Sequence, residues 1–579
     1  MRFGIFYEHQ LPRPWGPDAE HRLLSDALEQ VELADRAGLD YVWEVEHHFL
    51  EEYSHSSAPE VFLAAASQRT SSIRLGHGIV QAPAAVNHPA RIAERIATLD
   101  LVSDGRVEFG TGEASSAAEL GGFGVPRNAK RAMWAETLDA VTRMFTEEPF
   151  AGYRGDFVTM PPRSVVPKPL QKPHPPLWVA CSRRETIQLA ARSGLGALSF
   201  SFAEPAEAAR WVTEYYDLIC SDECVPRGFA VNANVAVVLP MMLHPDEATA
   251  IERGIDGAHF FGYSLGHYYG GTHLVGGTDL WHSFGQDRSA RGFARAIVAA
   301  DAAPLAVRLL QAEVGSLRGA IGTPAQVTDL IARYQAAGVD QVTFVLQSGR
   351  NQHEHICESI ELFAREVLPR FAEHRAEQEK AKADRLAAAA ERALARRPAP
   401  RTLAAPYPIN EEAELATARR AGQRPLRELA GQAGSAAGAA LRGRLQAGSQ
   451  RLAASASDAR IEQLLGGTTG QRAVLTLLAS RLDPARAAGL AGAIVFDLGM
   501  SDGTRRCWTI DVSRGRARAR PGGTRQAALT LRLTLADFIR VTAGAASFYQ
   551  LIAADRLLIE GDLALAGRLG EMFGARSVY

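Results

Sequence analysis

Short apolar runs alternate with amphipathic stretches through about the first 350 residues, and this alternation constrains the fold more than any other feature. A helix that ends near a glycine and passes directly into an apolar strand occurs three times, as RAGLDYVW, RSGLGALS and YQAAGVDQVTFVL. Parallel strands need such helical crossovers between them. The pattern therefore predicts a domain built from repeated strand–helix units.

Eight strands can be placed along this part of the chain. We expect them at residues 2–7, 40–45, 73–80, 106–111, 177–180, 196–200, 231–239 and 341–346. Eight parallel strands separated by helices make a (β/α)8 TIM barrel. The expected fold class is therefore α/β, with a TIM barrel in the first part of the chain.

Two segments interrupt the alternation. Residues 149–176 contain too many prolines for a helix, and we expect a short hairpin followed by an extended approach to the fifth strand. Residues 255–320 combine aromatic side chains with glycines and show no clean period. We expect a mobile cover over a cavity there. The alternative is a disordered surface insertion, which would normally contain fewer aromatic residues.

The stretch WEVEHHF places a carboxylate and two imidazoles, Glu46, His47 and His48, directly after the second expected strand. The C-terminal ends of barrel strands are where TIM-barrel enzymes carry their chemistry. A lone histidine is more often a structural hydrogen-bonding group. Metal binding is the rival interpretation for the pair, but no H-x-x-x-H pattern completes a metal site. We therefore expect catalytic residues here and no metal.

Composition excludes several classes of protein. The formal net charge is −2 and 46% of the residues are hydrophobic, so nothing favours nucleic acid as a partner. No signal peptide or transmembrane segment is predicted, which makes a cytoplasmic location the default. The cysteines are too few and too scattered for a disulfide framework or a zinc site. They are Cys181, Cys220, Cys224, Cys357 and Cys507.

The composition changes after about Arg375. We expect residues 1–375 to form the barrel domain, residues 376–459 a linker, and residues 460–579 a second globular domain. The linker begins with a charged, alanine-rich stretch of strong helix propensity, which extends the last barrel helix or forms a spacer helix. An Ala/Gly/Arg-rich run with few large apolar residues follows it.

An ordered set of motifs resembles the bacterial luciferase-like, flavin-dependent monooxygenases over about the first 370 residues. The motifs are MRFGIF, VWEVEHHF, IRLGHGIV, NHPARIAERIATLDLVSDGRVEFGTG and KPHPPLWVACS. The resemblance implies that reduced FMN binds at the barrel mouth and reacts with O2 to form a C4a-peroxyflavin. It also implies that this peroxide attacks an apolar aldehyde, ketone or related organic substrate. The family includes F420-dependent oxidoreductases, so F420 is the alternative cofactor.

The resemblance assigns the chemistry to the EHH stretch. His47 matches the family histidine that acts as acid or base near the flavin, Glu46 is the carboxylate before it, and His48 supports them. An imidazole titrates near neutral pH, which suits a group that gives or takes a proton. Gly78 and Ile79 match the segment that lies against the flavin ring, where a glycine permits close approach.

The match at the flavin is incomplete. Gly112 stands where luciferase has a cysteine, which leaves more room beside the ring. Ser182 and Thr186 match phosphate ligands at the start of a helix, where free N–H groups favour an anion. Glu113 stands where an arginine is expected, and Arg183 or Arg184 is the candidate replacement cation.

The C-terminal part resembles the sterol carrier protein 2 (SCP2)-like fold, through AIVFDLG, CWTIDVSRG, LTLRLTLADFIRVTAG and LLIEGDLALAGRLGEMF. The resemblance implies a tunnel for lipids or other apolar molecules. Candidate lining residues, each of which is more often plain core, are Phe496, Trp508, Leu533, Phe538, Phe548 and Leu551. Several arginines surround the middle hairpin, where we expect a solvated face. Docking to an acidic partner or a membrane surface is the alternative.

The leading hypothesis is an FMNH2- and O2-dependent monooxygenase, an oxidoreductase whose apolar substrate is held or presented by the SCP2-like domain. No second dinucleotide-binding fingerprint is present, so a separate flavin reductase is expected to supply reduced flavin. Members of this family commonly form homo-oligomers. The alternatives are an F420-dependent oxidoreductase and a non-catalytic flavin- or lipid-binding protein.

Overall fold

The structure is a computed structural model with two compact units, Met1–Gly422 and Gln423–Tyr579. It describes residues 1–182, 184–199, 205–270, 276–288, 309–310, 313–314, 318–404, 406–410, 457–480, 482, 492–513, 516–524, 526–543, 551, 556–562, 565 and 569.

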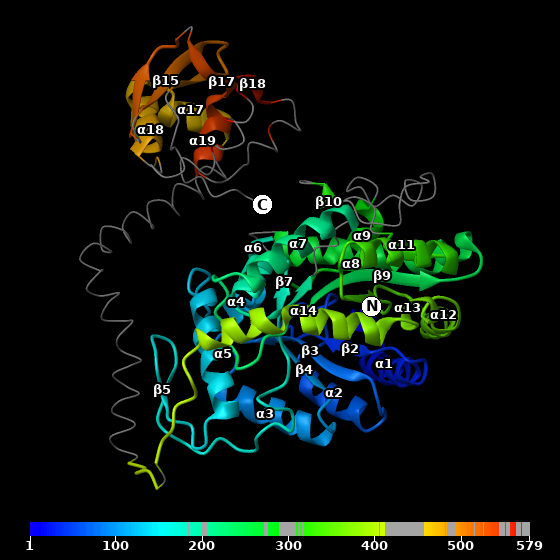
Figure 1. Ribbon diagram of the computed structural model, residues 1–579. Helices are drawn as coiled ribbons and strands as arrows, with labels where there is room; N and C mark the ends of the chain where they lie inside the picture. The colour runs from blue at the N-terminus through cyan, green and yellow to red at the C-terminus, as the bar shows by residue number, and fades with distance from the viewer. Residues whose placement is uncertain are drawn as a thin grey trace. The chain divides into compact units, whose positions relative to one another are not determined.

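Eight parallel strands close into a barrel in the first unit, which confirms the predicted TIM barrel (Figure 1). In spatial order they are β1 (Arg2–Tyr7), β2 (Tyr41–Glu44), β3 (Arg74–Gln81), β4 (Val107–Gly112), β7 (Leu177–Cys181), β8 (Gly196–Ser199), β9 (Val235–Leu243) and β13 (Gln341–Val345). The pairing of β13 with β1 closes the ring. We call the C-terminal ends of these strands the mouth and their N-terminal ends the floor.

Helices separate the strands as expected. They are α1 (Ala19–Arg36), α2 (Pro59–Ser67), α3 (Pro89–Val102), α4 (Ala117–Gly122), α5 (Lys130–Thr146), α6 (Arg184–Arg192), α7 (Pro205–Cys220), α8 (Glu247–Gly270), α9 (Leu280–Asp287), α11 (Pro324–Ala336), α12 (His353–Glu366) and α13 (Pro369–Ala372). The proline-rich interruption contains the expected hairpin, β5 (Tyr153–Arg154) with β6 (Thr159–Met160).

Two tryptophans fill the barrel interior because glycines face them from neighbouring strands. A Cβ at Gly76 would lie 2.2 Å from the ring of Trp43, and one at Gly196 would lie 2.4 Å from the ring of Trp178. The two indoles meet edge to face, with centroids 5.2 Å apart. The glycines therefore determine which side chains pack inside the ring.

Two predictions about this unit are wrong in part. The strand expected at residues 231–239 lies at 235–243, because it continues past Pro240 to pair with the short β12 (Ala320–Gly322). An irregular cover was expected at residues 255–320. Most of the described residues in this range instead form the helices α8 and α9. Aromatic residues of α8, such as Phe260, are buried against the barrel interior, so they belong to the core. The remainder of that prediction, including residues 289–308, lies outside the described residues.

The helix expected after Arg375 is present as α14 (Arg375–Ala395), and it packs across the barrel floor (Figure 1). Arg375 Nη1 lies 2.9 Å from Asp40 Oδ1, just before β2. Lys382 Nζ lies 2.7 Å from Asp340 Oδ1, just before β13. Ion pairs with residues that precede the strands thus hold α14 against the floor.

The second unit contains a five-stranded sheet in the order β16 (Arg516–Pro521), β15 (Arg505–Ser513), β14 (Gly492–Gly499), β17 (Ala527–Thr534), β18 (Leu558–Gly561). Its described helices are α17 (Asp458–Leu465), α18 (Thr468–Ser480) and α19 (Leu535–Ala543). Five of the six candidate lining residues share one hydrophobic core: Phe496, Trp508, Leu533, Phe538 and Leu551. The sixth, Phe548, lies outside the described residues, as do Arg514 and Arg525, two of the arginines that surround the middle hairpin in the sequence.

Candidate active site

His47 lies at the barrel mouth between two buried carboxylates. Its Nδ1 lies 2.8 Å from Glu119 Oε1, and its Nε2 lies 3.5 Å from Glu8 Oε2. Glu8 directly follows β1, His47 belongs to the loop after β2, and Glu119 belongs to α4. None of the three is more than 6% exposed. Parallel strands that end at one rim therefore bring groups from distant parts of the chain onto one imidazole.

Glu119 is fixed on several sides. Ser116, the N-cap of α4, donates its hydroxyl to Glu119 Oε2 at 2.7 Å. The backbone N–H of His48 donates to Oε1 at 3.2 Å, and the side-chain amide of Gln81 also donates to Oε1. These contacts leave the carboxylate one orientation, with Oε1 toward His47.

The carboxylates control the charge of His47. Burial alone would lower the pKa of His47, but the charges of Glu8 and Glu119 outweigh that effect and raise it to about 9. Burial likewise works to raise the pKa of Glu119, yet His47 holds it below its ordinary value. His47 is therefore an imidazolium at neutral pH, paired with an ionised Glu119.

Glu8 has a different environment from Glu119. Burial raises the pKa of Glu8 to about 7, and the nearby His47 charge offsets only part of that increase. Tyr53 donates its hydroxyl to Glu8 Oε1 at 2.9 Å. Glu8 Oε2 has no hydrogen-bond partner within the described part of the chain. Glu8 is thus a carboxyl that changes its charge near neutral pH.

The structure separates the three predicted residues into two groups. Glu46 accepts hydrogen bonds from the backbone N–H of Gln81 at 2.8 Å and from Asn87 Nδ2 at 2.7 Å. His48 Nε2 lies 3.0 Å from Glu46 Oε1. Glu46 and His48 therefore pair with each other, whereas the hydrogen-bonding carboxylate of His47 is Glu119.

Sequence reasoning missed three residues at this site. Glu8 follows the first strand as Glu46 follows the second, so the same positional rule identifies it. Glu119 carries no comparable signal, because it comes from a helix 72 positions along the chain. Tyr269, in the segment expected to be a cover, has its hydroxyl 3.3 Å from Nδ1 and 3.4 Å from Nε2 of His47.

Backbone lines the rim beside these residues. The pairing of β3 with β4 is irregular between His77 and Val80, which is the stretch that contains Gly78 and Ile79. A Cβ at Gly112 would lie 2.8 Å from Ile79 Cγ2. Glycine at position 112 therefore lets Ile79 pack closely against the backbone of β4, because any side chain there would collide with Ile79, one of the residues predicted to contact a flavin ring.

The other end of the candidate site combines hydroxyls with paired cations. Ser182 is exposed directly after β7, and Thr186 lies in the first turn of α6. Glu113, the unexpected anion, is neutralised by Lys130 at 3.2 Å and Arg131 at 2.7 Å. Arg184 pairs instead with Glu214 at 2.7 Å on the surface. Arg183 lies outside the described residues.

Comparison with known proteins identifies the barrel. The family model for luciferase-like monooxygenases matches residues 1–341, more than half of the chain. The chain belongs to this family. A second model, the SCP-2 sterol transfer family, matches residues 473–574.

Relatives of this luciferase-like protein include named oxygenases. The oxygenase component of the flavin-dependent trigonelline monooxygenase of Acinetobacter baylyi is 28% identical over 34% of this chain and 52% of its own length. Limonene 1,2-monooxygenase of Rhodococcus erythropolis is 36% identical over 25% of this chain and 36% of its own length. The chain thus spans about half or less of the length of these two relatives.

A solved structure supports the same fold. Monooxygenase RslO1 from Streptomyces bottropensis aligns with a TM-score of 0.50 and 25% identity, over 64% of this chain and all of that one. Family membership and the named relatives support an oxidoreductase. None of the described helices is both long and apolar enough to cross a membrane. Among the described residues, no three His, Cys, Asp or Glu side chains are grouped to hold a metal ion.

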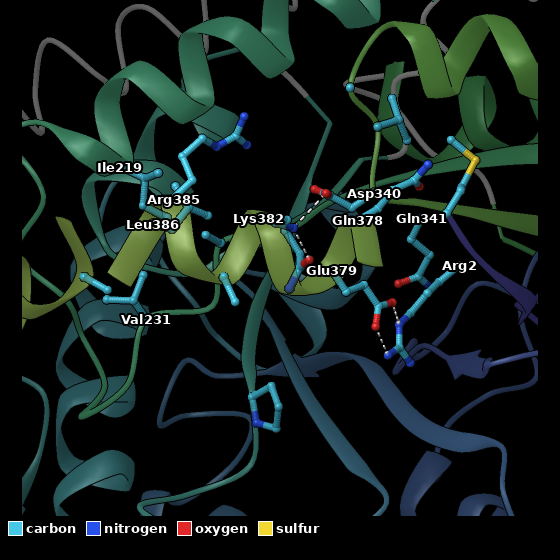
Figure 2. A pocket seen from close by; sticks show the side chains of 18 of the residues that line it. Arg2, Ile219, Val231, Asp340, Gln341, Gln378, Glu379, Lys382, Arg385 and Leu386 are labelled. Atoms are coloured by element: carbon cyan, nitrogen blue, oxygen red, sulfur yellow. Dashed lines mark hydrogen bonds and ion pairs between the residues drawn. The ribbon is translucent and has the colours of Figure 1, made fainter. Parts of the chain in front are cut away.

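A cavity of about 760 Å³ lies at the floor, at the opposite ends of the strands from the candidate active site. Figure 2 shows residues that line it. Arg2 and Glu379 pair at its charged end, and Ile219, Val231 and Leu386 line its apolar end. Four of the nine α14 residues that line it are alanines, whose side chains are too small to fill the gap. Because the luciferase-like residues lie at the mouth, we assign the chemistry to the mouth.

Proposed function

We propose that this protein is a monooxygenase that uses reduced FMN and O2 to oxygenate an apolar organic substrate at the barrel mouth. The observation that carries the proposal is His47, buried at the mouth of a luciferase-like barrel and held protonated by carboxylates. A relative named as a flavin-dependent monooxygenase supports the choice of flavin.

The residues at the mouth fit a flavin mononucleotide. Gly112 suits a flat ring beside Gly78 and Ile79, because a side chain at position 112 would push Ile79 out of the place where we expect it to contact the ring. Ser182, Thr186 and the N-terminus of α6 suit a phosphate. Lys130 and Arg131 offset the negative charge of Glu113 nearby. When bound, reduced FMN supplies the electrons that activate O2.

His47 acts as the acid in this proposal. Its Nδ1 is committed to Glu119, so Nε2 is the atom that gives a proton to a developing oxyanion and later regains one. Tyr269 and Tyr53 lie beside the imidazole, with ring centroids 6.1 and 5.9 Å from its own, and exclude water from it. Glu46 and His48 shape the loop that positions His47.

The supply of flavin and substrate completes the proposal. The Acinetobacter relative is named as an oxygenase component, which supports a separate reductase as the source of reduced flavin. We propose that the SCP2-like domain, residues 460–579, holds or presents the apolar substrate to the barrel domain, residues 1–375. Of residues 376–459, which lie between them in the sequence, residues 376–395 belong to α14 and pack on the barrel.

The test is oxygen incorporation from isotopically labelled O2. Purified protein is mixed with FMNH2, 18O2 and limonene, the substrate named for the Rhodococcus relative, together with a panel of aldehydes and ketones, and products are analysed by mass spectrometry. We expect one 18O atom in a product, and its loss in His47→Gln. If no substrate gains 18O but reduced F420 supports a redox reaction, the F420-dependent alternative replaces this proposal. If both fail while flavin binds, the barrel is a binding protein.

A further inference from the structure

The two sides of the His47 ring face carboxylates that are held very differently. Glu119 is 0% exposed and accepts hydrogen bonds from Ser116, Gln81 and the His48 backbone. A carboxylate with that many donors keeps its charge and its orientation. The Nδ1 proton is therefore fixed between His47 and Glu119.

Only one carboxylate oxygen of Glu8 accepts a hydrogen bond from the described residues. Oε1 accepts the Tyr53 hydroxyl, and the backbone carbonyl of Glu8 accepts the Ser54 hydroxyl at 2.8 Å. Oε2 has no hydrogen-bond partner among the described residues and lies 3.5 Å from His47 Nε2. An N–H···O hydrogen bond needs about 3 Å, so a movement of about half an ångström joins the two atoms.

The charges facing this pair favour a shared proton. His47 is faced by Glu8 after β1, by Glu119 on α4, and by Tyr53 and Tyr269. Glu46, which also acts on the charge of His47, is itself bound to Gln81, Asn87 and His48. Two ionised carboxylates around one imidazolium leave a net negative charge in a nearly dry site, whereas a protonated Glu8 leaves none.

We infer that Glu8 is a positioning residue that exchanges a proton with His47 Nε2, while Glu119 fixes the Nδ1 proton. When Nε2 has given its proton away, the O–H bond at Glu8 Oε2 breaks and the N–H bond at Nε2 forms again. Glu8 becomes a carboxylate and His47 returns to the imidazolium form. The use of this proton in oxygenation rests on the proposed function, but the exchange itself does not.

The experiment follows the imidazole in the full chain without flavin. Histidine labelled with 13C at Cε1 is incorporated, and the His47 signal is identified by its absence in His47→Gln. We expect His47 to titrate with a pKa of about 9. Glu8→Gln is expected to lower that pKa by about 1 unit or more, since one neighbouring charge is removed. Glu8→Asp should lower it less.

Glu44→Gln is the matched control. Glu44 is a buried carboxylate on β2 that pairs with His9 at 3.1 Å, and among the described residues it makes no hydrogen bond or ion pair with His47. It should leave the His47 titration in place. An unchanged titration in both Glu8 variants, or an equal shift in the control, overturns the inference. If Glu8→Gln does not fold, Glu8→Asp decides.

The two proposals fail separately. A shifted His47 titration without 18O incorporation supports the proton exchange and removes the proposed function. Incorporation of 18O that is unaffected by Glu8→Gln between pH 6 and 9, together with an unshifted titration, does the reverse. Glu8→Asp should also partly restore the pH–rate profile that Glu8→Gln alters.

Discussion

The mouth and the floor of one barrel use charged residues in opposite ways. At the mouth, Glu8, His47 and Glu119 are almost fully buried, and Glu8 Oε2 has no hydrogen-bond partner among the described residues. At the floor, ion pairs such as Arg2 with Glu379 and Lys382 with Asp340 are partly exposed and fully matched. At the mouth, charged groups are buried at a cost in free energy, which is typical of catalytic residues. At the floor, ion pairs hold α14 against the barrel.

Backbone strain follows the same division. Of the five described non-glycine residues with positive φ, four follow strands at the mouth: His9, Phe49, Glu51 and Ala114. Such conformations cost about 1–3 kcal/mol each and persist only where surrounding contacts impose them. The fifth, Asp104, belongs to a turn that precedes β4 on the floor side. Strained backbone conformations that gather at one end of a barrel are typical of a functional site.

The largest expected difference between the two ends is in activity. His47→Gln at the mouth should lower kcat/KM for oxygenation by about 100-fold or more, because the proposed proton donor is lost. Lys382→Met at the floor should leave it within about twofold. Comparable losses in both variants would show that the two ends are not functionally distinct.

The pH dependence of stability should also separate the ends. The pKa of His47 is raised in the folded state, so its contribution is complete below about pH 6.5 and is lost as the pH rises through about 9. Between pH 7 and 10 the wild-type barrel should lose about 2 kcal/mol more unfolding free energy than His47→Gln does. Urea denaturation followed by tryptophan fluorescence measures this, because six of the seven tryptophans lie in the barrel unit. If the unfolding free energies of the wild type and His47→Gln changed equally with pH, the positive charge assigned to His47 would be contradicted.

Flavin binding should depend on the position of Ile79 at the mouth, which Gly112 permits. Gly112→Ala places a methyl group 2.8 Å from Ile79 Cγ2 and should raise the Kd for FMN about fivefold, as overpacking by about 1 kcal/mol implies. Gly121→Ala is the control, because its added carbon meets nothing within 4 Å. Quenching of FMN fluorescence gives both constants. Equal affinities would place the ring elsewhere.

Loosening the floor should affect stability and leave chemistry unchanged. The double variant Arg375→Ala, Lys382→Ala removes two ion pairs of α14 and should lower the unfolding free energy by about 1 kcal/mol at low salt. The loss should shrink in 1 M NaCl, where charges are screened. Arg365→Ala, at an exposed position on α12, should show neither effect. A salt-independent loss would mean that packing rather than charge holds α14.

The smallest effect is expected from filling the floor cavity. Ala390→Leu adds apolar volume to its lining and should raise the unfolding free energy by about 0.5 kcal/mol. Ala388→Leu, at an exposed position that does not line the cavity, should not. A destabilised Ala390→Leu would show that α14 cannot move to accept the larger side chain.

Features that depend on residues close together in the sequence could be predicted from it. Alternation and glycine stops located the eight barrel strands, with the seventh displaced by four residues, and the strand-end rule placed Glu46, His47 and His48 at the mouth. The same rule, applied to the first strand, also points to Glu8. Glu119 could not be predicted, because its role depends on where α4 places a side chain that sequence separates from His47 by 72 positions. The α8 helix was missed because its glycines and aromatics hide a helical period, although burial in the barrel stabilises it.

The position of α14 in the sequence determines when its contacts with the barrel floor can form during synthesis. Arg2 and its partner Glu379 are 377 positions apart, so a ribosome that adds about 5–20 residues per second makes the second roughly 20 to 75 s after the first. Until then the charged floor of the nascent barrel has no cover. All eight barrel strands are therefore synthesised before α14. The ion pairs between α14 and the floor are among the last contacts of the barrel unit that can form.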